Sequence, residues 1–184
     1  MQITWIVIGS IVLMVFYVWS LYNGLVTLKT QIAEGWSQID VQLKRRADLI
    51  PNLVETVKGY AKHEKQVFTE VTKARSALMG AKSPSKLAAA SDMLSGALGR
   101  LFAIAEAYPE LKANDGFVQL QRELSDTEDK VAYSRQYYNE TVKEYNVKIL
   151  LFPNSIVASQ MGFTKQEFFQ ATTDERKAVK VNFS

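Results

Sequence analysis

The feature that most constrains the fold of this chain is an apolar stripe that begins near Leu21 and continues to the region of Met79. Its members recur at steps of three or four residues, the period of one face of an α-helix. The stripe keeps its phase across Pro51 and thins near Glu64. A proline inside a helix removes a hydrogen bond and costs about 3 kcal/mol. The pattern predicts either one long kinked helix or two helices that reverse at residues 50–52, and the lack of a glycine or turn dipeptide beside the proline favours the kink.

Two further helical segments follow recognisable boundary residues. Ser83 and Pro84 are typical of an N-cap and a first helical position, and the apolar period after them continues until Pro109. Asn114 and the residue after it can cap another segment, which keeps the same period until Pro153. The connections between consecutive helical segments are short, so we expect each to join antiparallel neighbouring helices.

The predicted fold is therefore all-α, with an antiparallel up-and-down helical bundle over residues 23–153. The bundle has three long helices, or four if Pro51 is a turn.

An uncharged, strongly apolar run over residues 3–21 precedes this bundle. About 19 residues at about 1.5 Å each span roughly 28 Å, close to the hydrocarbon thickness of a bilayer, about 30 Å. Aromatic side chains lie near both ends of the run, as is typical of the two headgroup layers: Trp5, Tyr17, Trp19 and Tyr22. A cleaved signal peptide is the alternative, but it requires a basic start and a small-x-small cleavage site. We therefore expect residues 1–22 to be an uncleaved, single-pass anchor in the cell membrane.

Basic residues follow the apolar run but do not precede it. Lys29 is the first charged residue of the chain, and a group of three cations follows at residues 44–46. Because lysine and arginine are enriched on the cytoplasmic side of a span, this distribution favours a cytoplasmic C-terminal domain.

The last part of the chain, residues 154–184, departs from the long helical period. Residues 154–161 can form a short helix with Gly162 after its end, and Thr164 to Glu167 has the spacing of a capping box for a second one. Near the C-terminus, Val179, Val181 and Phe183 alternate with polar residues. This period of two predicts an extended segment that lies in a groove or adds to another chain.

Composition excludes several kinds of chemistry. The net charge is +3 without a basic arm, which makes nucleic acid a poor candidate partner, and cysteine is absent. The single histidine, His63, has neighbouring carboxylates, but they do not converge as metal ligands on a helix do. The acidic cluster Asp126, Glu128 and Asp129 spreads around a helix and is expected to be a solvated face. We therefore predict no catalytic, cofactor or metal site, and no enzyme activity.

Other residues are candidates for interaction. The cations Lys44, Arg45 and Arg46 fan around one side of a helix, where nearby aspartates can pair with them at the surface. Alternatively, with the break at Pro51, they form a docking surface for a neighbouring subunit, or they attract anionic lipids if the helix folds back toward the bilayer. The full set of candidate interaction residues is Trp36, Lys44, Arg45, Arg46, Pro51, Val179, Val181 and Phe183.

Several stretches share a family signature. The earlier ones are Leu21–Val26, Trp36, Ile39–Arg46, Asp48–Val54 and Val57–Glu64, and the later ones are Tyr108-Pro109, Leu111–Ala113, Tyr138-Asn139, Tyr145-Asn146, Phe152-Pro153 and Val181–Phe183. Together they resemble the LemA family of bacterial membrane proteins. The resemblance implies an N-terminal transmembrane helix, an up-and-down four-helix bundle, kinship with a magnetosome membrane protein, and no known catalytic activity. A bundle of four helices favours a turn at Pro51 over a kink.

These features predict a non-enzymatic, membrane-anchored structural protein that assembles with itself through its helical domain. Its expected partners are the lipid bilayer and further copies of the same chain. Buried aromatic side chains are common at such subunit contacts. The alternative is a membrane adaptor that recruits another membrane protein, such as a protease.

Overall fold

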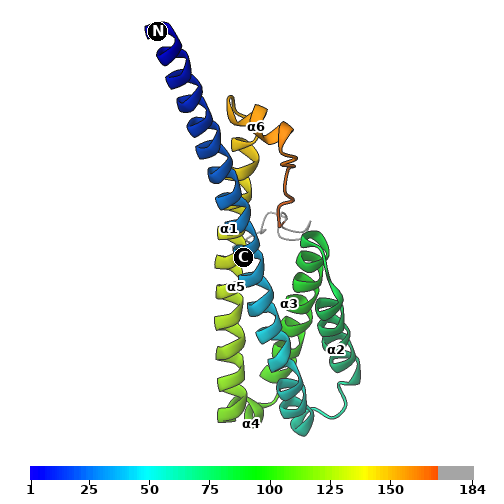
Figure 1. Ribbon diagram of the computed structural model, residues 1–184. Helices are drawn as coiled ribbons and strands as arrows, with labels where there is room; N and C mark the ends of the chain where they lie inside the picture. The colour runs from blue at the N-terminus through cyan, green and yellow to red at the C-terminus, as the bar shows by residue number, and fades with distance from the viewer. Residues whose placement is uncertain (170–184) are drawn as a thin grey trace, which may run out of the picture. The chain divides into compact units, whose positions relative to one another are not determined.

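The computed structural model describes residues 1–169, and this part of the chain is helical without strands (Figure 1). The helices are α1 (Gln2–Tyr60), α2 (Lys65–Gly80), α3 (Pro84–Glu106), α4 (Pro109–Lys112), α5 (Asp115–Lys148) and α6 (Asn154–Gln160). The prediction of an all-α protein is confirmed. The described chain forms two compact units: unit 1 holds residues 1–37 and 136–168, and unit 2 holds residues 38–135 and Phe169. Helices α1 and α5 contribute to both.

The reversal predicted at residues 50–52 does not occur, and neither does a single helix up to Met79. Pro51 lies inside α1, which ends at Tyr60, and the chain turns between Ala61 and Glu64 before α2 begins. The turn coincides with the place where the apolar stripe thins. Few apolar side chains need burial there, and the polar ones can face water, so the helix can end without loss of core contacts.

Helix α1 tolerates Pro51 because another side chain replaces the missing donor. A proline at this position leaves the carbonyl of Ala47, four residues earlier, without its helical partner. The Nε of Arg75, on α2, donates a hydrogen bond to that carbonyl oxygen at 2.8 Å. The proline itself is exposed, while Ile50 and Leu53 beside it are 1% and 0% exposed. The apolar stripe therefore remains in the core across the proline.

Unit 2 builds its core from four helical segments: α1 from Gln38 onward, α2, α3 and the part of α5 up to Arg135 (Figure 1). Each contributes fully buried apolar side chains, among them Leu43, Val57, Val71, Leu94, Leu101 and Leu124. Two predicted caps are confirmed. The Oγ of Ser83 accepts from the backbone N–H of Lys86 ahead of Pro84, and the Oδ1 of Asn114 accepts from that of Phe117 at 3.0 Å.

Unit 1 pairs the first part of α1 with the last part of α5. A Cβ on Gly35 would lie 3.4 Å from the Cα of Tyr138, and one on Gly24 would lie 3.6 Å from the Nζ of Lys148. An earlier residue of α1 thus lies near a later residue of α5, so the two segments are antiparallel. The core residues of this unit include Leu25, Leu28, Ile32, Val142, Tyr145, Ile149 and Val157.

Two predicted boundaries of unit 1 need correction. Helix α5 ends at Lys148 rather than at Pro153, and a turn precedes α6. The short helix before Gly162 is confirmed, and this glycine has the positive φ, 71°, expected after a helix. The second short helix is wrong, because residues 163–169 are not helical. Their backbone is bound instead by side chains of α5, as described below.

Candidate functional site

The N-terminal part of α1 presents apolar side chains on all its sides. Its most apolar window has a mean hydropathy of 2.1 and is 0% buried, so this segment is long and apolar enough to cross a membrane. Large apolar side chains are widely exposed there, among them Trp5 and Leu13 at 73%, Phe16 at 61% and Trp19 at 60%. In water, such a continuous apolar surface is costly, since burying it gains about 25 cal/mol per Å².

Helix α3 also passes the length and hydropathy test for a span, with a mean hydropathy of 1.3. Its environment is different, because 44% of that window is buried. Leu94 and Leu101 are both 0% exposed and belong to the core of unit 2. The apolar character of α3 is therefore explained by packing within unit 2.

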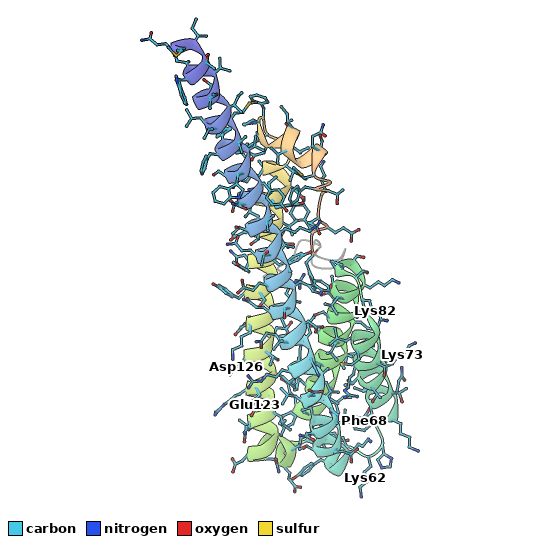
Figure 2. The ribbon with its side chains drawn as sticks, in the orientation of Figure 1. Lys62, Phe68, Lys73, Lys82, Glu123 and Asp126 are labelled. Atoms are coloured by element: carbon cyan, nitrogen blue, oxygen red, sulfur yellow. The ribbon has the colours of Figure 1, made fainter. Side chains whose placement is uncertain are left out.

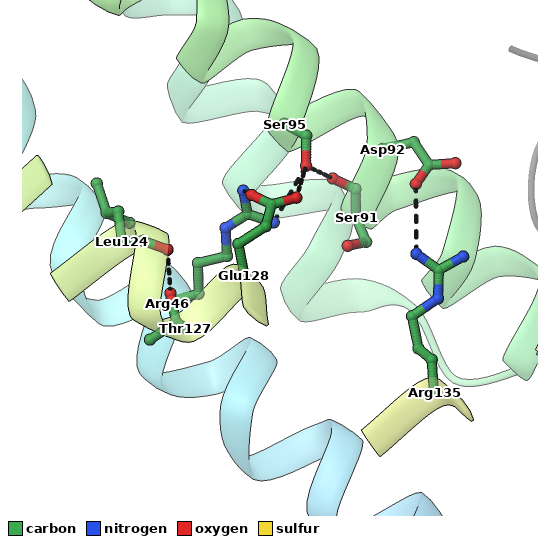
Figure 3. Close-up of polar contacts among 8 residues, drawn as sticks. All are labelled: Arg46, Ser91, Asp92, Ser95, Leu124, Thr127, Glu128 and Arg135. Atoms are coloured by element: carbon green, nitrogen blue, oxygen red, sulfur yellow. Dashed lines mark hydrogen bonds and ion pairs between the residues drawn. The ribbon is translucent and has the colours of Figure 1, made fainter. Parts of the chain in front are cut away.

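A buried arginine joins three helices in unit 2 (Figure 3). Arg46 on α1 is 2% exposed; it forms an ion pair with Glu128 on α5 and donates from Nη1 to the Oγ of Ser95 on α3 at 3.1 Å. The Ser95 hydroxyl is also 3.1 Å from Oε1 of Glu128 and 3.2 Å from the carbonyl oxygen of Ser91, which are alternative acceptors. The network cross-links α1, α3 and α5.

The charge of Arg46 is set by opposing effects. Burial lowers the pKa of its guanidinium below the ordinary value of 12.5, while the carboxylates of Glu128 and Asp92 raise it. An arginine stays protonated under physiological conditions, so the cation is retained inside unit 2. Because the network ties together side chains of α1, α3 and α5, it positions these helices in unit 2.

The sequence-based interpretation missed this network. Glu128 was expected on a solvated face, and its side chain is indeed 52% exposed, yet it is the partner of the buried Arg46. The two residues are far apart in the chain, and no local spacing relates them. The one signal available in the sequence was the run of three consecutive cations beside a continuous apolar stripe. Consecutive residues point to different sides of a helix, so if the helix packs on two sides, one of the three cations faces a neighbouring helix.

A groove of about 930 Å³ lies on unit 2, lined by residues of α2, α3 and α5. Its lining includes the small residues Gly96 and Ala132 together with three cations and three carboxylates. Two of the cations are paired within the groove, Arg100 with Glu70 and Arg135 with Asp92. Small residues let another chain approach closely, and the charged residues around them suit a chain that carries charges of both signs.

In unit 1, side chains of α5 hold the extended segment that follows α6. The Nδ2 of Asn146 donates to the carbonyl oxygen of Gln166 at 2.9 Å, and its Oδ1 accepts from the backbone N–H of the same residue at 2.9 Å. The hydroxyl of Tyr138 donates to the carbonyl oxygen of Glu167 at 2.9 Å. Burial, and then the nearby Glu167 carboxylate, raise the pKa of Tyr138 above its ordinary value. These bonds occupy backbone groups that a helix starting at Thr164 would need.

The predicted interaction residues lie in different environments. Trp36 is half-buried in unit 1, where its ring centroid is 6.0 Å from that of Tyr138. Lys44 and Arg45 are exposed on unit 2, whereas Arg46 is interior and leaves only the first two cations accessible.

The remaining candidates are as follows. Pro51 is exposed on α1, and His63 is exposed in the turn after it. Within residues 1–169, no group of three or more His, Cys, Asp or Glu side chains is placed to hold a metal ion. Val179, Val181 and Phe183 lie outside the described residues.

An exposed apolar helix of membrane-spanning length, attached to an all-helical body, is typical of membrane-associated helical proteins. The chain belongs to the LemA family, whose model matches residues 35–183. The resemblance recognised in the sequence is confirmed.

Three relatives extend this comparison. Protein LemA of Metamycoplasma hominis is 30% identical over 158 residues, which cover 84% of this chain and 71% of that protein. Magnetosome protein MamQ 2 of Paramagnetospirillum magneticum is 26% identical over an alignment of 175 residues that covers 81% of this chain. Magnetosome protein MamQ of Magnetospirillum gryphiswaldense is 27% identical over an alignment of 174 residues that covers 80% of this chain. The alignment spans 64% of the length of each of these two magnetosome proteins.

Proposed function

We propose that this protein is a non-enzymatic scaffold, held in the membrane by α1 and assembled from copies of itself through its helical domain. The anchor is supported by the uncharged apolar run, which is 0% buried and matches a bilayer in length. Lys29 is the first charged residue after the run, and because no charge precedes the run, this distribution supports a single-pass anchor with the body on the cytoplasmic side. The body is proposed to be an up-and-down four-helix bundle.

The observation that carries self-assembly is a separation of charge across unit 2. The basic flank runs from Lys62 to Lys86 and has six basic and two acidic residues, whereas the acidic flank from Asp115 to Lys130 has five acidic and two basic ones. Figure 2 shows Lys73 and Lys82 on the α2 side of this unit, away from Glu123 on α5. These two lysines are exposed.

Opposite charge on the two flanks suits contact between copies of one chain. The basic flank of one copy faces the acidic flank of the next, which is a heterologous contact that propagates into rings or rows. Beside Asp126 and Asp129, Tyr133 is 72% exposed and can supply apolar contact area at low entropic cost. Anchoring of every copy in one bilayer restricts the orientations available and raises the effective concentration.

A charge-swap experiment tests the proposal. The full chain is purified in a neutral detergent at low salt, and its mass is measured by light scattering. We expect oligomers that shrink as salt is added, because exposed charges are screened beyond about 10 Å at 0.1 M. Asp126→Lys with Asp129→Lys, or Lys73→Glu with Lys82→Glu, is expected to abolish assembly, and mixing the two variants is expected to restore it.

The matched control replaces Lys44 and Arg45 by glutamate. This change alters charge by the same amount on an exposed part of unit 2 that lies outside both flanks. If only this control disperses the oligomer, the contact lies on α1, as the sequence first suggested. A wild-type chain that stays monomeric at every salt concentration rules out self-assembly.

The anchor is tested separately by washing membranes with alkaline carbonate. An integral protein stays in the pellet, and recovery in the supernatant contradicts the anchor whatever the oligomeric state.

The groove on unit 2 favours a second candidate function, that of a membrane adaptor. Its small residues, surrounded by charged side chains of both signs, fit a helix or strand of another membrane protein, such as a protease. A photo-reactive residue at Met93, which lines the groove and is 50% exposed, tests this in intact cells. Cross-links only to copies of the same chain contradict the adaptor.

A further inference from the structure

Unit 1 carries a second exposed apolar surface, separate from the anchor. It comprises the turn before α6, Ile156 on α6 and Met161 just after it, with exposed fractions of 61% at Leu150, 56% at Leu151, 80% at Phe152, 56% at Ile156 and 58% at Met161. We call these five residues the α6 surface. A soluble helical unit of this size rarely leaves so many large apolar side chains together in water.

The α6 surface belongs to an uncharged stretch with a charged residue on each side, which is the pattern of a membrane segment. From Ile149 to Thr164 the chain has no charged side chain, and a lysine stands on each side, at Lys148 and Lys165. Lysines beside an apolar segment can reach lipid phosphates while the segment lies among the acyl chains. A solvent-facing turn and helix would not require this pattern.

Contacts within unit 1 place the α6 surface at the end of the membrane span. The Nζ of Lys148, just before the surface, lies against Gly24, and the ring of Phe163, just after it, is 5.8 Å from that of Tyr22. The Nζ of Lys29 is 5.9 Å from the same phenylalanine ring. Both ends of the uncharged segment therefore meet α1 where its apolar run gives way to charged residues.

The direction of α5 carries the segment toward the lipid. Helices α5 and α1 are antiparallel in this unit, so a chain that leaves Lys148 continues toward the N-terminal, apolar part of α1. Figure 1 shows α6 at that end of α5, beside α1. The α6 surface thus lies near the level of Tyr22, one of the aromatic residues that mark the headgroup layer.

We propose that the α6 surface is an interfacial membrane contact, inserted into one leaflet beside the span. This inference rests on the proposed anchor. Phe152 and Ile156 lie among the upper acyl chains, and Lys148 and Lys165 face lipid phosphates. The contact fixes the tilt of unit 1 against the bilayer, since a single helix alone can rotate and swing about its point of entry.

The absence of cysteine from the chain permits a direct test. Single variants Phe152→Cys and Ile156→Cys of the full chain are labelled with an environment-sensitive dye and placed in vesicles of 70% phosphatidylcholine and 30% phosphatidylglycerol. Both positions are exposed, so the substitutions leave the core of unit 1 intact. We expect blue-shifted emission at both positions and at least twofold quenching by lipids that carry a nitroxide near the headgroup.

Two control positions separate the outcomes. Leu13→Cys lies within the span, and Gln136→Cys is exposed on α5, about 18 Å before Lys148 along the helix. Quenching at Leu13 but not at Phe152 or Ile156 overturns the α6 contact and leaves the anchor standing. No quenching at Leu13 overturns the anchor. Blue-shifted emission at Phe152 that nitroxide lipids do not quench shows that protein covers the surface, which also overturns the proposal.

Discussion

Unit 1 and unit 2 both bury an apolar core, but they differ in the side chains that bond to polar groups left without a partner in a helix. In unit 2, guanidinium groups supply the missing donors: Arg75 binds the Ala47 carbonyl, and Arg46 joins Ser95 to Glu128. In unit 1, an amide and a phenol hold the extended segment, through Asn146 and Tyr138.

The difference teaches how each unit is suited to its surroundings. A charged group is expensive to remove from water, and an ion pair offsets that cost only when its geometry is good. Neutral amides and phenols are cheaper in a low-dielectric environment. Unit 1 contains the proposed membrane span and uses neutral groups, whereas unit 2 does not contain it and uses cations. The following substitutions test this comparison, from the largest expected effect to the smallest.

Glu128→Ala is expected to be the most damaging, because it leaves the buried Arg46 cation without its carboxylate. Breaking a fully buried pair costs about 3–5 kcal/mol. Because Glu128 is 52% exposed, water replaces part of the interaction, and we expect a loss of about 2–3 kcal/mol in urea unfolding. The matched control is Arg46→Met with Glu128→Ala, which removes both charges and is expected to recover most of the loss. Equal losses in both variants contradict a role for the ion pair.

Arg75→Ala is expected to destabilise unit 2 by about 1–2 kcal/mol, because the Ala47 carbonyl is then buried without a donor. In a Pro51→Ala background, the new N–H at position 51 can bond that carbonyl, so the same substitution should cost about 1 kcal/mol less. A double-mutant cycle measured by denaturant unfolding gives this coupling. Strict additivity would show that the arginine does not compensate for the proline.

Asn146→Ala removes both hydrogen bonds to Gln166 and is expected to cost about 1 kcal/mol, mostly through local opening of the segment after α6. Hydrogen exchange should show faster exchange at Gln166 and unchanged exchange in α3. Gln136→Ala, at an exposed position of the same helix, is the control. Equal acceleration across both units indicates global destabilisation instead.

Tyr138→Phe and Tyr145→Phe form a pair with a smaller expected effect. The first loses a hydrogen bond to Glu167, at about 1 kcal/mol, while the second removes a buried hydroxyl that has no hydrogen-bond partner in the described structure and is expected to be neutral or slightly stabilising. A loss at Tyr145 larger than that at Tyr138 would contradict this assignment.

The same tyrosines give a pH dependence. Burial raises the pKa of both, with a further contribution from Glu167 at Tyr138, so the folded state favours the neutral phenol. Their contribution is fully present below the ordinary pKa of about 10 and is lost as the pH rises through the higher folded-state pKa. Unfolding measured between pH 8 and about 11.5 should show this decline, and both phenylalanine variants should flatten it.

Much of the helical architecture could be predicted from local patterns. The caps at Ser83 and Asn114 were correct because a capping side chain bonds backbone within its own turn. The turn after Tyr60 was missed because Pro51 looked like the stronger breaker. The destabilisation of a helix by an internal proline depends on whether the freed carbonyl, here that of Ala47, receives another hydrogen bond. Arg75 donates one from another helix.

The sequence by itself determined the all-helical character, the apolar N-terminal run and the family, because these depend on composition, periodicity and short-range order. Tertiary structure decided which charged residue is buried, which carbonyl receives Arg75 and why residues 163–169 are extended. Those outcomes depend on partners distant in the chain, such as Arg46 with Glu128 and Asn146 with Gln166. A side chain's local sequence limits the bonds that it can form, but the packing of helices selects the partner that it meets.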